Sequence, residues 1–129
     1  MGLSARTDQI GASQLKYILD HYGYPMQLVE TPPDVLHFKT DCSLIDDQCI
    51  FSTERLASSG CFAGYHTLIA PEGEEAAANM IRFNDYIIMP AGFPKTEAIL
   101  KAEGFAVICV GNSECAKIDG GMSCLSLRF

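Results

Sequence analysis

The strongest constraint on the fold of this 129-residue chain is the mixing of two helical hydrophobic patterns with several short apolar runs. Apolar residues recur at helical spacing over residues 10–19, where Thr7 and Asp8 are the candidate N-caps, and the pattern stops at Gly23 and Pro25. A second helix is predicted over residues 96–103. Two clear helical segments are therefore predicted.

Strands are predicted wherever a short apolar or β-branched run lies between turn residues. The runs lie at residues 26–29, 35–38, 48–51, 67–70, 86–89, 105–110 and 123–129. Residues 75–79 fit either a helical turn or a loop. A rhythm of strand, helix and strand excludes a helical bundle and a pure sandwich, so the predicted fold class is α/β, with residues 1–129 forming one domain.

Composition narrows the classes of partner. The formal net charge is −7, and no cluster of Lys and Arg occurs anywhere, which argues against a nucleic acid or an anionic membrane surface as partner. A small ligand, a cationic one included, suits this charge better, but an acidic balance is also common in proteins that it simply keeps soluble. No targeting segment and no apolar stretch long enough to cross a bilayer is found, so a cytoplasmic location is expected.

The six cysteines do not form a recognisable framework. Their spacings contain no CxxC pair, so neither a zinc knuckle nor a disulfide scaffold is indicated, and most are expected to be small buried apolar residues. A metal site using Cys124 and His37 would have only two ligands, which makes a poor site. We therefore expect no metal and no cofactor.

Catalysis by a cysteine requires a stabilised thiolate and a histidine that transfers protons. Of the three histidines, His21 closes the first helix and is expected to face solvent, and His66 is expected in a loop or at a strand edge. His37 interrupts an apolar predicted strand, where burial of a polar ring would demand a partner. On this spacing alone, His37 is either a satisfied core residue or a functional one.

A second element lies near the C-terminus. Asp119 and two glycines precede Met122, Ser123 and Cys124. Two glycines allow a tight turn or a close approach of the backbone to a ligand, and the cysteine would stand at the mouth of a strand. A turn followed by an ordinary buried cysteine explains the same residues, so spacing alone leaves both interpretations open.

Three segments together resemble the dimethylarginine dimethylaminohydrolases of the guanidino-modifying, or amidinotransferase, superfamily. They are GLSARTD at residues 2–8, LHFKTDCSLID at residues 36–46 and KIDGGMSCLSLRF at residues 117–129, and they occur in the family's order and at similar separations. EEAAANMIRFN, at residues 74–84, resembles the corresponding intervening stretch. The resemblance covers nearly the whole chain.

The resemblance implies a role for four residues. Cys124 would be the nucleophile that attacks the guanidinium carbon and forms a covalent thiouronium intermediate, and His37 would protonate the departing amine and then activate water. Arg6 would bind the substrate carboxylate, and Asp119 would contact the substrate beside the nucleophile. Lys39 stands where arginine deiminases carry an aspartate, which favours the dimethylarginine branch over deiminases and amidinotransferases.

The resemblance also implies the architecture. The family fold is a five-module α/β propeller about twice as long as this chain, so residues 1–129 would be its C-terminal half, about two and a half ββαβ-type modules, with the N-terminal half absent. Open sheet edges seek partners, so we expect self-association or a complementary N-terminal fragment. The expected activity is hydrolysis of N-methylated arginine, incomplete in this portion alone. The alternative is a non-catalytic remnant or a guanidino-binding module.

Overall fold

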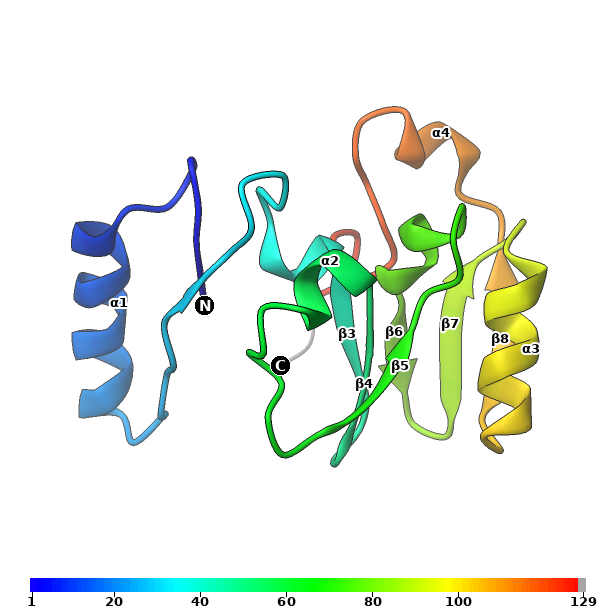
Figure 1. The fold of residues 1–129 in the computed structure, drawn as a ribbon, viewed down its shortest axis with the longest axis horizontal. Coiled ribbons are helices and arrows are strands. Elements are labelled where there is room, and N and C mark those ends of the chain that lie inside the picture. The colour runs from blue at the N-terminus through cyan, green and yellow to red at the C-terminus, as the bar shows by residue number, and fades with distance from the viewer. Residues whose placement is uncertain (128–129) are drawn as a thin grey trace. The chain divides into compact units, whose positions relative to one another are not determined.

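The computed structural model describes residues 1–127, which form two compact units, one of residues 1–38 and one beginning at Lys39. Figure 1 shows the elements of both units. In chain order they are β1 (Gly2–Leu3), α1 (Gln9–His21), β2 (Val29–Glu30), the 3-10 helix η1 (Phe38–Thr40), β3 (Cys42–Asp46), β4 (Cys49–Ser52), α2 (Glu54–Ala57), β5 (His66–Ile69), the 3-10 helix η2 (Glu75–Ala78), β6 (Ile81–Phe83), β7 (Tyr86–Pro90), α3 (Pro94–Ala102), β8 (Ala106–Val110) and α4 (Ser113–Ala116). This composition confirms the α/β class.

The first unit is a short parallel pair of strands, β1 and β2, connected by helix α1. The helix confirms the first helical pattern. Asp8 is its N-cap, because the Asp8 carboxylate accepts a hydrogen bond of 2.8 Å from the Gly11 N–H. The helix ends before Gly23, whose φ of 76° is a left-handed conformation that glycine adopts without strain.

Two strands predicted in the first unit are wrong in part or entirely. Of residues 26–29, only Val29 is in a strand. Residues 35–38 form none. The Val35 N–H bonds the Pro32 carbonyl in a turn, and the Leu36 carbonyl accepts a hydrogen bond from the Ser4 hydroxyl. These local bonds occupy backbone groups that a strand would need for its ladder.

The second unit repeats one supersecondary pattern twice (Figure 1). In each repeat an antiparallel strand pair is followed by a helix and a third strand that lies parallel to the second: β3, β4, α2 and β5, then β6, β7, α3 and β8. A parallel neighbour requires a crossover connection, which α2 and α3 provide. The predicted runs at residues 48–51, 67–70, 86–89 and 105–110 correspond to β4, β5, β7 and β8, and the second helical pattern corresponds to α3. Strands β3 and β6 were not among the predicted runs.

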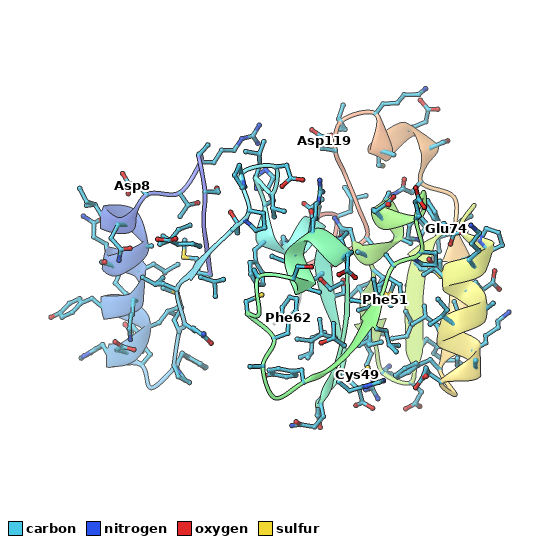
Figure 2. The ribbon with its side chains drawn as sticks, viewed as in Figure 1. Asp8, Cys49, Phe51, Phe62, Glu74 and Asp119 are labelled. Carbon is cyan, nitrogen blue, oxygen red and sulfur yellow. The ribbon has the colours of Figure 1, made fainter. Side chains whose placement is uncertain are left out.

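One apolar core joins the two repeats. Most of its buried members come from strands β3, β4, β5 and β7, from η2 and from α3, and include Phe51, Met89 and Leu100, each 0% exposed. Phe51 is labelled among the side chains of Figure 2. Ala77 and Ala78 belong to the same cluster, so the segment that was left open between helical turn and loop is a 3-10 helix packed on the core. This packing fixes the position of Asn79, the residue that directly follows η2.

The final predicted strand is also wrong over the residues that can be compared. Residues 123–125 lie in a turn, in which the Cys124 and Leu125 N–H groups both donate to the Gly121 carbonyl at 3.2 Å, and residues 126 and 127 are in no regular element. Residues 128 and 129 of that prediction lie outside the described residues. A search of residues 1–127 finds no helix that is both long and apolar enough to cross a membrane.

Candidate active site

The turn that carries Cys124 depends on an unusual backbone conformation at Asp119 and on the lack of a side chain at Gly121. Asp119 has a φ of 59°, in the left-handed region where aspartate is tolerated better than most residues. A Cβ atom added to Gly121 would lie 2.1 Å from the Asn79 amide nitrogen, so no larger residue fits there unless Asn79 moves. Gly121 therefore allows a close approach between the turn and Asn79, and Gly120 a close approach to the Cys115 backbone carbonyl.

Asn79 is the residue that holds this turn. Its side-chain oxygen accepts hydrogen bonds from the Ser123 N–H at 3.0 Å and the Ser123 hydroxyl at 2.7 Å. Its amide nitrogen donates to the Cys124 sulfur at 3.1 Å, and its backbone carbonyl accepts from the Met122 N–H at 3.2 Å. One buried side chain thus contacts the thiol and the residue beside it.

The environment of Cys124 favours its thiolate. Partial burial acts to raise the pKa of the thiol, but hydrogen bonds from the Asn79 amide and the Gly121 backbone, the charge of Lys39 and a hydrogen bond from Ser123 outweigh it. The pKa of Cys124 is therefore lowered from its ordinary value. Lys39 also donates to the Ser123 carbonyl at 3.3 Å. An exposed thiol with a lowered pKa is the type of cysteine that reacts as a nucleophile.

The other cysteines with a resolved shift have the opposite environment. Burial raises the pKa of Cys42 to about 12, and the nearby Cys61 and Asp41 act in the same direction. The pKa of Cys49 is raised by burial and by acidic neighbours. Cys109 is exposed like Cys124, but burial of its sulfur and a hydrogen bond with the Glu97 carboxylate raise its pKa. No disulfide is formed by the six cysteines.

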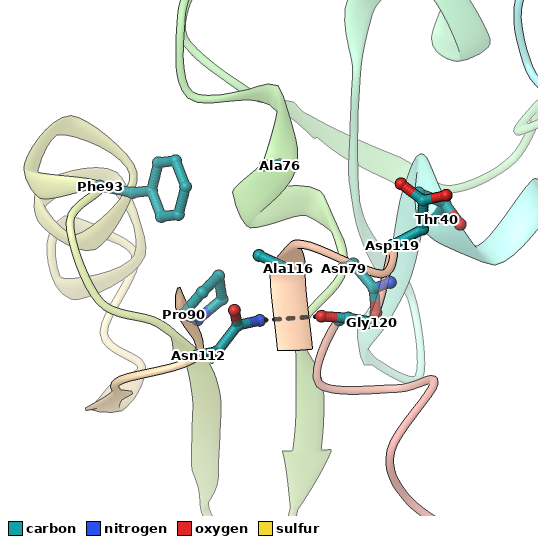
Figure 3. Close-up of a pocket in the computed structure, with 10 residues that line it drawn as sticks. Thr40, Ala76, Asn79, Pro90, Phe93, Asn112, Ala116, Asp119 and Gly120 are labelled. Atoms are coloured by element: carbon teal, nitrogen blue, oxygen red, sulfur yellow. Dashed lines mark hydrogen bonds between the residues drawn. The ribbon is translucent and has the colours of Figure 1, made fainter. Parts of the chain in front are cut away.

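A hollow of about 200 Å³ adjoins the turn at Gly120 and Gly121. Figure 3 draws the residues that line it. Asn79, Asp119, Gly120 and Gly121 line one part of it, and the Asn112 amide donates to the Gly120 carbonyl at 3.1 Å. The remaining lining residues are Thr40, Ala76, Pro90, Phe93 and Ala116. Pockets for drug-sized ligands measure about 300–1,000 Å³, so this hollow suits only a small group. Asp119 is the acidic residue on its wall.

The first unit brings together the other two predicted site residues. Residues 4–7 form a tight turn, and the Ser4 hydroxyl bonds both the Arg6 N–H and the Leu36 carbonyl, which ties the two segments together. Arg6 Nη1 lies 2.8 Å from His37 Nε2. Because a guanidinium only donates hydrogen bonds, Nε2 is the acceptor and the ring proton is on Nδ1.

The argument that singled out His37 from the sequence is wrong in its premise. His37 lies in no strand and is exposed, so burial does not demand its partner. The polar partner it has is Arg6. His21 is exposed, as expected, and His66 begins β5, where its Nε2 lies 3.8 Å from a Glu103 carboxylate oxygen.

In the first unit, Arg6 thus lies within hydrogen-bond distance of His37. In the second unit, Asn79 contacts Cys124 and lines the same hollow as Asp119. Sequence reasoning missed Asn79. The available signal was its place in the segment at residues 74–84, which matched the family pattern without pointing to any one residue. Of the nearby acidic residues, Asp41 is buried and pairs with Arg55 and Thr53, so its role is structural. Within residues 1–127, no group of three or more His, Cys, Asp or Glu residues is arranged to hold a metal ion.

The class of protein follows from comparison with solved structures. The fold matches an amidinotransferase of the saxitoxin biosynthetic pathway from Microseira wollei, with a TM-score of 0.83 over 95% of this chain and 41% of that one, at 18% identity. It also matches dimethylarginine dimethylaminohydrolase from Pseudomonas aeruginosa, a cysteine-to-serine mutant complexed with citrulline, with a TM-score of 0.93 over 100% of this chain and 50% of that one, at 39% identity. The fold is that of the amidinotransferase superfamily.

Sequence comparison narrows the class to a family. The chain is 40% identical over 129 residues to the N(G),N(G)-dimethylarginine dimethylaminohydrolase of Pseudomonas aeruginosa. This alignment covers 100% of the chain and 50% of that protein. The enzyme of the same name from Streptomyces coelicolor is 26% identical over 131 residues, or 49% of its length. No protein-family model matches. The chain is thus related along its whole length to the dimethylarginine dimethylaminohydrolase family, and it spans about half the length of the curated relatives it matches.

Proposed function

We propose that this chain carries the nucleophile half of an active site that hydrolyses N-methylated arginine to citrulline and an alkylamine. The observation that supports it most is the exposed Cys124, whose thiol accepts a hydrogen bond from the Asn79 amide and has a lowered pKa, while the acidic Asp119 lines the same hollow as Asn79. A thiolate attacks the electrophilic carbon, and a carboxylate beside it favours a cationic substrate.

In the proposed reaction the Cys124 thiolate attacks the guanidinium carbon, and His37, in its imidazolium form, donates a proton to the departing dimethylamine. This step leaves a thiouronium that joins Cys124 to the substrate. Water then adds to the same carbon as His37 takes its proton, the carbon–sulfur bond breaks, and citrulline is released with the thiolate restored. One water is consumed for each dimethylamine formed. Asp119 contacts the guanidinium group, and Arg6 binds the substrate carboxylate.

The comparisons support the choice of cysteine and histidine. A solved relative complexed with citrulline has a cysteine replaced by serine, and another, an adduct with S-methyl-L-thiocitrulline, has a histidine replaced by glycine. The substituted positions are as far apart in the numbering of those relatives as His37 and Cys124 are in this chain. Each substitution falls on one of the two residue types that the proposed reaction requires.

The proposal includes an architecture. The two ββαβ repeats are modules of a five-module propeller, and the remaining modules, with further acidic residues of the site, come from sequence outside these 129 residues or from a second copy of the chain. Strand β8 supports this architecture, because it pairs with β7 along one edge and its Ile108 and Val110 are exposed. Light scattering should show association at micromolar concentration, and a monomer would contradict this part of the proposal.

Labelling with an electrophilic amidine tests the site itself. We expect 2-chloroacetamidine, which is cationic, to modify Cys124 before the other five cysteines. Mass mapping of the adducts and parallel reactions with neutral 2-chloroacetamide would measure the preference for the cation. Asp119→Asn should reduce that preference and His37→Ala should weaken the labelling. Uniform labelling of the cysteines, or an amidine preference that Asp119→Asn leaves unchanged, would refute the proposed site.

A further inference from the structure

We propose that Asn79 is a positioning residue for the nucleophile, which holds the Cys124 sulfur as a thiolate through its amide N–H and fixes the turn at residues 121–124 through its amide oxygen. This inference rests on the proposed function, because it concerns the residue that performs the attack. It adds to the site a side chain that neither transfers a proton nor carries a charge.

The orientation of the amide is determined by its partners. The Ser123 backbone N–H is a donor only, so the atom 3.0 Å from it must be the Asn79 oxygen. The amide nitrogen then necessarily faces the Cys124 sulfur, at 3.1 Å. An N–H group directed at the sulfur stabilises the thiolate more than the thiol, because hydrogen bonds to a charged acceptor are stronger.

The amide also has little freedom to move. Asn79 is 3% exposed and directly follows the packed alanines of η2. The peptide groups on both sides are held by Ser43, whose hydroxyl oxygen lies 2.7 Å from the carbonyl oxygens of Ala78 and Met80 and accepts from the Met80 N–H at 3.1 Å. Because Ser43 belongs to β3, the first repeat anchors the residue that holds the nucleophile.

The glycine at position 121 fits the same explanation. The Asn79 amide occupies the space that a side chain at this position would fill, since an added Cβ would lie 2.1–2.7 Å from three Asn79 side-chain atoms. Close packing of the amide against the turn is therefore a requirement of this geometry. A residue that only filled space could be apolar, whereas both polar atoms of Asn79 have partners on the turn.

The test is the pH dependence of Cys124 alkylation by iodoacetamide in the full 129-residue chain, with each cysteine mapped by mass spectrometry. Asn79→Asp retains the oxygen that faces Ser123 but replaces the N–H facing the sulfur with an anionic oxygen. We expect the Cys124 profile to move to higher pH and the rate at pH 7 to fall about tenfold. Asn79→Ala should move the profile in the same direction by less.

Asn112 supplies the matched control. Its amide also holds the turn, through the Gly120 carbonyl, and also lines the hollow, but the hydrogen bond it makes is to that carbonyl and not to the thiol. Asn112→Ala should therefore leave the Cys124 profile in place. An equal shift in the Asn79 and Asn112 variants would overturn the inference, because it would show that any loosening of the turn suffices.

Buried thiols report whether a variant is folded. If Asn79→Asp exposes Cys42 and Cys49 to the reagent, Asn79→Ala decides the question: a profile at higher pH supports the inference and an unchanged profile overturns it. Iodoacetamide is neutral, so its rate follows the thiolate and does not depend on recognition of a guanidinium. Loss of the amidine preference with an intact pH shift would refute the proposed function alone.

Discussion

Two exposed cysteines of the second unit, Cys124 in the C-terminal turn and Cys109 in strand β8, show how neighbours determine the character of a thiol. Near Cys124, an amide N–H and a lysine lower the pKa. Near Cys109, burial of the sulfur and then the Glu97 carboxylate raise the pKa, although Lys101 acts to lower it. Exposure is similar, so the difference comes from hydrogen-bond donors and charge. Only the first environment suits a nucleophile at neutral pH.

The largest expected effect tests whether the two thiols are interchangeable. Cys124→Ser should slow the first modification of the chain by 2-chloroacetamidine by about tenfold or more, because the remaining exposed thiol is largely protonated at neutral pH. Cys109→Ser should leave that first modification unchanged. The measurement is the time course of adduct mass. A larger loss in Cys109→Ser than in Cys124→Ser would invert the comparison and refute the assignment of the nucleophile.

A substitution beside the turn should weaken Cys124 without touching it. Gly121→Ala places a Cβ where the Asn79 amide lies, so the amide must leave the sulfur, and Cys124 alkylation by iodoacetamide at pH 7 should slow by about five- to tenfold. Gly111→Ala is the matched control, since a Cβ there meets no atom within 4 Å. Mass-mapped rates in the two variants check this. Equal rates would mean that the close approach of Gly121 has no chemical consequence.

The difference in pKa between Cys124 and Cys109 can also be reduced by changing a neighbour of Cys109. Glu97→Gln removes the carboxylate charge that raises the pKa of Cys109, so the thiolate fraction of Cys109 at pH 8 should rise and its alkylation should accelerate about threefold. Glu114→Gln is a suitable control, because Glu114 pairs with Lys117. Mapped alkylation rates at pH 8 give the answer. An unchanged Cys109 rate would show that burial alone sets its pKa.

The smallest expected effect concerns Lys39, which is exposed and therefore screened by solvent. Lys39→Met should slow Cys124 alkylation by about two- to threefold at low salt, and Lys39→Arg should restore the rate by restoring the charge. Rates at low and high ionic strength measure this. A loss that Lys39→Arg does not restore would point to the hydrogen bond to the Ser123 carbonyl instead of the charge.

The sequence predicted those parts of the molecule that local rules determine. Helices α1 and α3 follow from periodicity and from end signals such as Asp8 and Gly104, which act over a few residues. Strands β4, β5, β7 and β8 follow from short apolar runs. The family resemblance indicated Cys124 and Asp119, which share the segment that the structure places at the hollow.

Long-range contacts explain what the sequence did not predict. The alternation of apolar and polar residues after Cys124 favours a strand. The glycine turn and its hydrogen bonds to Asn79, which is 45 residues from Cys124, take up the backbone groups that a strand would use. Asn79 was overlooked because an alanine-rich segment gives no sign that its last residue faces a thiol. His37 was chosen for a strand that does not form, although its contact with Arg6 gives it a polar partner.

The most direct test of the account is the pH profile of alkylation of all six cysteines in the unaltered chain, measured with a neutral reagent and mapped residue by residue. The account predicts that Cys124 reaches half of its maximal rate below the pH of an ordinary thiol and that Cys109 does so above it. Coincident profiles, or a Cys109 profile at lower pH than that of Cys124, would contradict the claim that the C-terminal turn is built to hold a nucleophilic thiolate.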